Sequence, residues 1–162
     1  MNAATLELEK RRDDALKAIL ENVPYNRFLE VSVDRLGDEL TARLPFRDEI
    51  VGNPFLPAIH GGVMGAFLEI TAQVQLGWLQ VSEHGAVNSE DNAAISGGAI
   101  PRIPKSIDIS IDYLRSARPR ETFARANVQK AGRRVVHLHV TAWQDQRERP
   151  VAMLRGNFLM PE

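Results

Sequence analysis

The chain has 162 residues, a formal net charge of −1 and no cysteine. The near-neutral charge argues against a general nucleic-acid or membrane-surface binder, and the lack of cysteine excludes disulfides, thiol catalysis and cysteine-ligated metal. The lack of cysteine also fits a cytoplasmic location. With 44% apolar and 25% charged residues the composition is ordinary for a globular protein, and the length predicts a single domain over residues 1–162.

The N-terminal residues 1–23 predict a helix over 3–22, and Pro24 prevents its continuation. The charges between Glu7 and Lys17 occupy positions where a signal peptide would need apolar residues. We interpret these charges as a solvated face of the helix. No stretch of the chain has the composition and flanks of a membrane span.

Two strands are predicted next, over 28–36 and 39–46, joined by a hairpin turn at Gly37-Asp38. A loop rich in turn-forming residues follows over 45–57. An apolar pattern with helical spacing then predicts a long helix over about 60–81.

Residues 82–104 show no hydrophobic period and are rich in Ser, Gly, Asn and Asp, so we expect a long mobile loop. The rest of the chain alternates between apolar and polar residues, as strands with one buried face do. Four strands are expected, over 107–113, 122–130, 136–143 and 151–160. The order α-ββ-α-ββββ predicts an α+β fold in which one long helix packs on an antiparallel sheet of about six strands.

Glu69 is the only carboxylate between Asn53 and Val81, inside the apolar helical pattern. A carboxylate in such a place needs a partner or a function if it is buried. On a helical wheel it lies opposite the expected core stripe, beside small or amide side chains such as Gly62 and Gln73. Glycine is unfavourable inside a helix, so its recurrence here predicts close approach by a substrate or another backbone. The alternative is an exposed charge on an amphipathic helix.

The helix is opened by His60-Gly61-Gly62. Backbone amides at a helix N-terminus have no partner within the helix and favour an oxyanion, so the Gly61 and Gly62 amides are candidate donors. For the His60 side chain we favour a role in holding the turn by hydrogen bonds over acid–base chemistry. Amides and a carboxylate on one helix indicate a site that handles an acyl carbonyl.

This segment resembles the hotdog-fold acyl-CoA thioesterases of the PaaI-like branch, named after the phenylacetate pathway. Their motif runs from an Asn to His-Gly-Gly and then to an acid nine residues after the His, here Asn53, His60 and Glu69. The strand SIDISIDYLR and the hairpin around Gly132-Arg133-Arg134 match as well, so the resemblance covers roughly residues 25–160. It implies a long central helix wrapped by a curved antiparallel sheet, with the N-terminal helix as an addition.

The resemblance also implies roles for individual residues. Gly61 would polarise the thioester carbonyl, and Glu69 would activate water or attack as the nucleophile. Asn53 would help to bind the carbonyl or the water, although it lies one residue further from the His than the family pattern has it. Ser106 matches a residue that orients water and is contributed by the other subunit.

The implied substrate is an acyl-CoA, with Gly62 and Gln73 as further substrate contacts. The implied assembly is a homodimer or homotetramer with active sites between subunits, without a metal or redox cofactor. The sequence also carries a basic cluster that is either a set of solvated strand ends or a contact to coenzyme A phosphates, because arginine suits phosphate oxygens. Its members are Arg115, Arg118 and Arg120, with Arg133 and Arg134.

A dehydratase and a non-catalytic acyl-binding protein are the alternative functions. A hotdog 3-hydroxyacyl thioester dehydratase would carry a catalytic His fourteen residues before Glu69, where this chain has Phe55. A non-catalytic acyl-binding protein would need an apolar slot but not the carboxylate. His137 and His139 share one face of a predicted strand without a nearby third ligand, so no metal site is expected.

Overall fold

The computed structural model describes residues 3–84 and 102–161. Two helices and a hairpin come first: α1 (Ala3–Glu21), α2 (Pro24–Phe28), β1 (Ser32–Leu36) and β2 (Glu39–Leu44). A 3₁₀ turn, η1 (Asp48–Ile50), and a small hairpin of β3 (Val51–Asn53) and β4 (Ala58–Ile59) lead into α3 (Gly61–His84). The remaining strands are β5 (Lys105–Tyr113), β6 (Thr122–Ala131), β7 (Val135–Trp143) and β8 (Ala152–Leu159).

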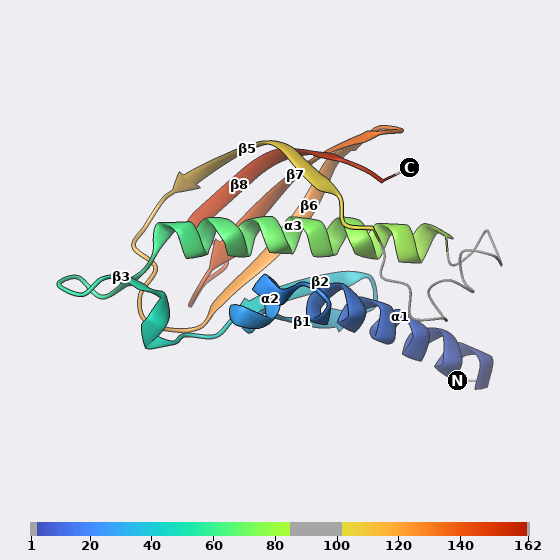
Figure 1. Cartoon of the computed structure of the whole chain (residues 1–162), viewed down its shortest axis with the longest axis horizontal. Coiled ribbons are helices and arrows are strands. Elements are labelled where there is room, and N and C mark those ends of the chain that lie inside the picture. Colours follow the sequence, from blue (N-terminus) through green and yellow to red (C-terminus); the bar gives the residue numbers. More distant parts are fainter. Residues whose placement is uncertain (1–2, 85–101, 162) are drawn as a thin grey trace.

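Six strands form one antiparallel sheet in the order β1-β2-β6-β7-β8-β5, and α3 runs along its inner face (Figure 1). This confirms the predicted α+β class, the hotdog arrangement and the additional N-terminal helix. The structure differs from the sequence prediction in three places. A short unpredicted helix, α2, precedes the first strand, which begins at Ser32 instead of Phe28. The predicted loop before the long helix contains η1 and most of the β3–β4 hairpin, and α3 continues to His84. The part of the predicted 82–104 loop that spans 85–101 lies outside the described residues.

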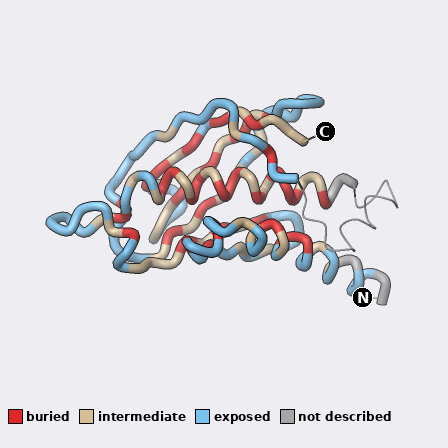
Figure 2. The backbone as a smooth tube through the Cα atoms, in the orientation of Figure 1, coloured by how far each residue is buried: buried red, intermediate tan, exposed pale blue. Residues whose placement is uncertain are grey.

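Helix α3 is covered on two sides, by the sheet and by α1 (Figures 1 and 2). Its side chains Phe67, Leu76 and Trp78 are all at most 1% exposed. Gly77 permits the close approach of α1, because a methyl group there would lie 2.8 Å from Cδ1 of Ile19. The sequence pattern indicated one core stripe on this helix. In the fold, the helix is buried on a second side as well, against α1. Among the described helices, none combines the length and the apolar character that crossing a membrane requires.

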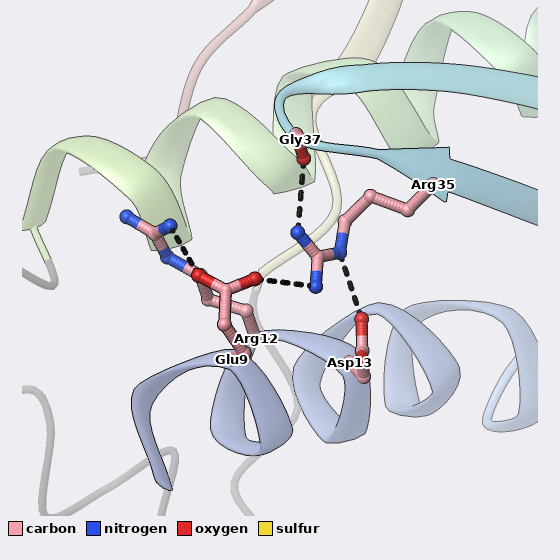
Figure 3. Close-up of polar contacts among 5 residues, drawn as sticks. All are labelled: Glu9, Arg12, Asp13, Arg35 and Gly37. Carbon is pink, nitrogen blue, oxygen red and sulfur yellow. Dashed lines mark hydrogen bonds and ion pairs between the residues drawn. The ribbon is translucent and has the colours of Figure 1, made fainter. Parts of the chain in front are cut away.

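The guanidinium of Arg35 joins three elements where α1, the β1–β2 turn and α3 meet (Figure 3). Its Nη2 binds Glu9 at 2.8 Å, its Nε binds Asp13 at 2.7 Å and its Nη1 donates to the Gly37 carbonyl at 2.9 Å. The group also lies 5.3 Å from the ring centroid of Trp78. The hydrogen bond that Arg35 donates to Asp13 raises the pKa of Arg35 against the opposing effect of burial, so the side chain stays charged.

This arrangement corrects the interpretation of the charged face of α1. Glu9 also accepts a hydrogen bond from Arg12 at 3.1 Å, and the Arg12 guanidinium lies 6.0 Å from the Trp78 ring (Figure 3 shows the Glu9–Arg12 bond). These charges are therefore a docking surface rather than simply a solvated face. The Arg35 side chain is only 11% exposed, so its loss would leave two carboxylates without their main partner.

We predict that Arg35→Ala lowers the free energy of unfolding by about 1–2 kcal/mol, because a partly buried charge network loses its centre. Urea unfolding followed by circular dichroism measures the change. The control is Arg11→Ala, which removes an exposed pair with Glu7 and should change stability by less than about 0.5 kcal/mol. Equal unfolding midpoints for the two variants would contradict a docking role for Arg35.

Candidate functional site

Glu69 is half-buried on α3 and accepts a hydrogen bond from the Oγ of Ser106 on β5. No cation pairs with this carboxylate in the part of the chain that the structure describes. The alternative of an exposed surface charge is therefore wrong, and Glu69 is not held in a structural ion pair. The expectation that Ser106 reaches such a carboxylate only from another subunit is also wrong, because the fold brings the two together within one chain.

A β-bulge in β5 is what aims Ser106 at the helix. Ser106 pairs with Phe158 and Asp108 pairs with Asn157, so Ile107 is an extra residue between them. A one-residue insertion moves the side chains before it to the opposite face of the sheet. Ser106 thus shares the helix-facing side with Ile111, and Ile107 is 57% exposed. The strict alternation of the sequence predicts Ile107 on the buried face. The local sequence does not predict the bulge.

The carboxylate lies on a less-buried stripe of α3. Gly62, Ala66, Glu69 and Gln73 are partly or fully exposed, whereas most of the surrounding helix positions are buried. These four positions are spaced so that they share one helical face. The predicted placement of Gly62 and Gln73 beside Glu69 is therefore confirmed, and their contact with substrate stays a prediction.

The turn before α3 is held by His60. Its Nδ1 accepts a hydrogen bond from the Gly62 amide at 2.9 Å, its own amide donates to the Ile50 carbonyl at 2.8 Å, and its carbonyl accepts from the Met64 amide at 3.0 Å. Because Nδ1 is an acceptor, the neutral ring carries its proton on Nε2. The structure thus supports the turn-holding role favoured for His60.

Only one of the two candidate oxyanion donors is available. The Gly62 amide is occupied by His60, which corrects the expectation that both amides would be open. The Gly61 amide meets no acceptor among the described residues, and it lies at the positive end of a 24-residue helix. Gly61 is therefore the donor that remains for a carbonyl oxygen.

The glycines at the start of α3 face side chains of β5. The Tyr113 hydroxyl donates to the Gly61 carbonyl at 2.7 Å, and a methyl group at Gly61 would lie 3.4 Å from the tyrosine ring. At Gly65 a methyl group would meet Cδ1 of Ile111 at 3.0 Å. In this chain, then, the close approach predicted from the glycines is made by Tyr113 and Ile111.

The Asn53 side chain is engaged in its own turn, and its contact with the substrate carbonyl or the water stays a prediction. Its Oδ1 accepts hydrogen bonds from the Phe55 amide at 3.0 Å and the Leu56 amide at 3.3 Å, and the residue is exposed. This local turn shapes the tip of the β3–β4 hairpin. Phe55, the position that would carry the dehydratase His, is 92% exposed at that tip, so the structure offers no acid–base pair of the dehydratase kind.

A cavity of about 470 Å³ lies beside the Gly61 amide. Its lining includes Met64, Tyr113, Leu114 and Arg115. The lining combines apolar side chains with polar groups and one guanidinium.

The basic residues lie at two ends of the sheet. Arg115 donates to the Pro150 carbonyl at 2.6 Å, and the Arg118 amide donates to Gln144 just beyond the end of β7. Arg133 lies in the β6–β7 turn at the far end of these strands, next to the end of β5 that holds Ser106. A ten-residue strand spans about 33 Å, so the predicted basic residues form two separate groups in one chain.

No set of three or more His, Asp or Glu side chains is arranged to hold a metal ion within residues 3–84 and 102–161. The Nδ1 of His137 instead contacts the Asn157 Oδ1 at 3.0 Å, on the outer face of the sheet.

Comparison with known proteins places this geometry in a family. The model of the thioesterase superfamily matches residues 56–151, which include the His60-Gly61-Gly62 turn, Glu69 and Ser106. The chain belongs to the thioesterase superfamily. It is also 30% identical over 139 residues to the medium/long-chain acyl-CoA thioesterase YigI of Escherichia coli K12, a match that covers 78% of this chain and 84% of YigI.

Solved structures agree with this assignment. A protein of Chromobacterium violaceum is 32% identical with a TM-score of 0.65, covering 97% of this chain and 98% of that one. A phenylacetic acid degradation-related protein of Ralstonia eutropha JMP134 has a TM-score of 0.62 over 90% of this chain and 98% of its own, and its 17% identity shows the fold alone. The predicted relationship to the PaaI-like hotdog thioesterases is confirmed.

We predict that Gly52→Ala disturbs the turn that precedes α3. A methyl group at this position would lie 2.7 Å from the Cα of His60, and a backbone atom cannot move aside cheaply. The free energy of unfolding should fall by about 1–3 kcal/mol, measured by urea unfolding. Gly61→Ala is the control, since its methyl group makes an ordinary contact with Tyr113 and should change stability little. Equal stability of the two variants would contradict tight packing at Gly52.

Proposed function

We propose that this protein hydrolyses acyl-CoA thioesters. The observation that carries the proposal is the pairing of Glu69 with Ser106 on the less-buried stripe of α3, in a chain whose Gly61 amide is open at the helix N-terminus. Membership of the thioesterase superfamily and similarity to YigI, named for medium- and long-chain acyl-CoA, support the same reaction.

In the proposed reaction, the thioester carbonyl oxygen accepts a hydrogen bond from a Gly61 amide, which stabilises the charge that develops on it. Glu69 takes a proton from water while the water oxygen bonds to the carbonyl carbon. The carbon–sulfur bond then breaks, and coenzyme A leaves as a thiolate that recovers the proton. The Ser106 hydroxyl orients the carboxylate. Alternatively, Glu69 attacks the carbonyl carbon directly and coenzyme A leaves. Water then hydrolyses the resulting anhydride.

The amide and the carboxylate of one chain cannot serve the same thioester. Gly61 and Glu69 are eight residues apart on one helix, which separates them by about 12 Å along its axis. The donor must lie about 3 Å from the carbonyl oxygen, and the base must lie about 3 Å from the water that attacks the carbonyl carbon. A complete site therefore combines Gly61 of one copy with Glu69 and Ser106 of a second copy. This division replaces the expectation that Glu69 and Ser106 come from different chains.

The edge strand β5 supports such a pairing. It has nine residues, its outer edge pairs with no other strand among the described residues, and Ile107 and Tyr113 on it are more than half exposed. Edge strands of this length readily pair with another chain. Antiparallel pairing of two β5 strands about a two-fold axis near Ile109 brings the Ser106 end of one copy beside the Tyr113 end of the other. Tyr113 in turn contacts Gly61.

The same two-fold arrangement brings the two basic groups together. Arg115 and Arg118 lie at the Gly61 end of one copy, and Arg133 lies at the Ser106 end of the other. We propose that these three residues bind the phosphates of coenzyme A at the composite site, with Gly62 and Gln73 along the path of the acyl thioester.

We predict that Glu69→Gln lowers kcat by about 100-fold or more across a panel of acyl-CoA esters from short aliphatic to aromatic, because an amide can neither accept the proton nor attack. Release of free thiol measures the rate. The control is Glu49→Gln, an exposed carboxylate in η1, which should leave the rate unchanged. Binding of acyl-CoA without thiol release by the wild-type protein would contradict the proposal and favour a non-catalytic acyl-binding protein.

The shared site makes a complementation prediction. Gly61→Pro removes the amide donor at a helix position that tolerates proline, and Glu69→Gln removes the base. In a mixed dimer one site carries both defects and the other carries neither. Unfolding and refolding the two inactive variants together should therefore restore about a quarter of the wild-type rate, since half of the dimers are mixed. No recovery, with mixed dimers present by native mass spectrometry, would contradict a site shared between chains.

A further inference from the structure

The Gly61–Gly62 peptide unit is held at both ends by side chains. Its carbonyl oxygen accepts a hydrogen bond from the Tyr113 hydroxyl at 2.7 Å, and its N–H donates to His60 Nδ1 at 2.9 Å. One of these side chains belongs to the turn itself. The other comes from the end of β5, fifty-two residues away in the chain.

The neighbouring peptide unit, between His60 and Gly61, carries the open amide. Its carbonyl accepts a hydrogen bond from the Met64 amide at 3.0 Å, so this unit is anchored through its oxygen while its N–H stays open. Both peptide planes that meet at Gly61 are therefore fixed by hydrogen bonds. The direction of the open N–H is set by these restraints rather than by a side chain of its own.

Restraint matters here because the donor belongs to one of two consecutive glycines. Glycine has more backbone freedom than any other residue, and a helix terminus frays most easily. An oxyanion donor is effective only when its direction is set before the charge develops, because reorientation during the reaction offsets the stabilisation. Two glycines at the first turn of α3 would not supply a preorganised donor by themselves.

We propose that Tyr113 is a positioning residue that preorganises the Gly61 amide through the Gly61 carbonyl. This inference rests on the proposed thioesterase function and goes beyond it by assigning a role to a residue that need not touch the reacting atoms. The tyrosine ring lies on the same side, because a methyl group added at Gly61 would meet it at 3.4 Å. The hydroxyl, and not the ring alone, is the part that fixes the peptide plane.

The test is Tyr113→Phe, which keeps the ring and removes the hydroxyl. We expect kcat for acyl-CoA hydrolysis to fall about tenfold, while KM and the thermal unfolding midpoint stay within the error of the wild-type values, because the restraint acts on the transition state. Tyr25→Phe is the matched control, since Tyr25 is the other tyrosine of the chain and lies on α2, stacked against Phe28. It should change neither kcat nor KM.

A double-mutant cycle shows whether the hydroxyl acts through the amide. In the Gly61→Pro background the amide is absent, so Tyr113→Phe should cause no further loss of the residual kcat. An additive loss in that background would overturn the inference. So would a kcat of Tyr113→Phe equal to that of the wild type, or a change confined to KM. An absence of thiol release by the wild-type protein would instead overturn the proposed function on which the inference rests.

Discussion

The burial of α3 between two layers is the constraint on which the rest of the structure depends. The sheet covers one side of the helix and α1 covers another, so most of its positions must be apolar or small. Glu69 lies on a less-buried stripe that faces the edge strand β5, with a hydroxyl of that strand as its partner. The docking of α1 depends in turn on the charges around Arg35, which lie at the edge of this packing rather than inside it.

The two halves of the candidate site are each organised inside one chain before any partner arrives. One half is the carboxylate, aimed by Ser106 from a bulged strand. The other half is the open amide of Gly61, at a turn held by His60 and Tyr113. The length of the helix keeps these halves about 12 Å apart in one copy. Under the proposed arrangement, association of two chains joins two prepared surfaces, and neither half has to be rebuilt when the chains meet.

A single inserted residue has a large effect in this fold. Without the extra Ile107, the alternation of β5 would turn the Ser106 hydroxyl to the outer face of the sheet, where Asp108 and Asp112 lie. The bulge thus links the strand to the carboxylate, and it leaves an isoleucine exposed on a strand that forms the edge of the sheet as far as the structure describes it. Both features concern the same strand, which also carries Tyr113 at its other end.

The sequence by itself determined the main order of elements, the long apolar helix, the hairpin at Gly37 and the place of Gly61 and Glu69 on one helix, because these follow from hydrophobic period, turn chemistry and motif spacing. Tertiary structure alone decided that Ser106 meets Glu69 within one chain, that Gly62 is occupied by His60 and that the Asn53 side chain is engaged in its own turn. It also separated the two arginine groups and placed Tyr113 on the Gly61 carbonyl. These outcomes depend on strand register, on a bulge and on contacts between residues far apart in the chain. The local sequence pattern does not determine any of these.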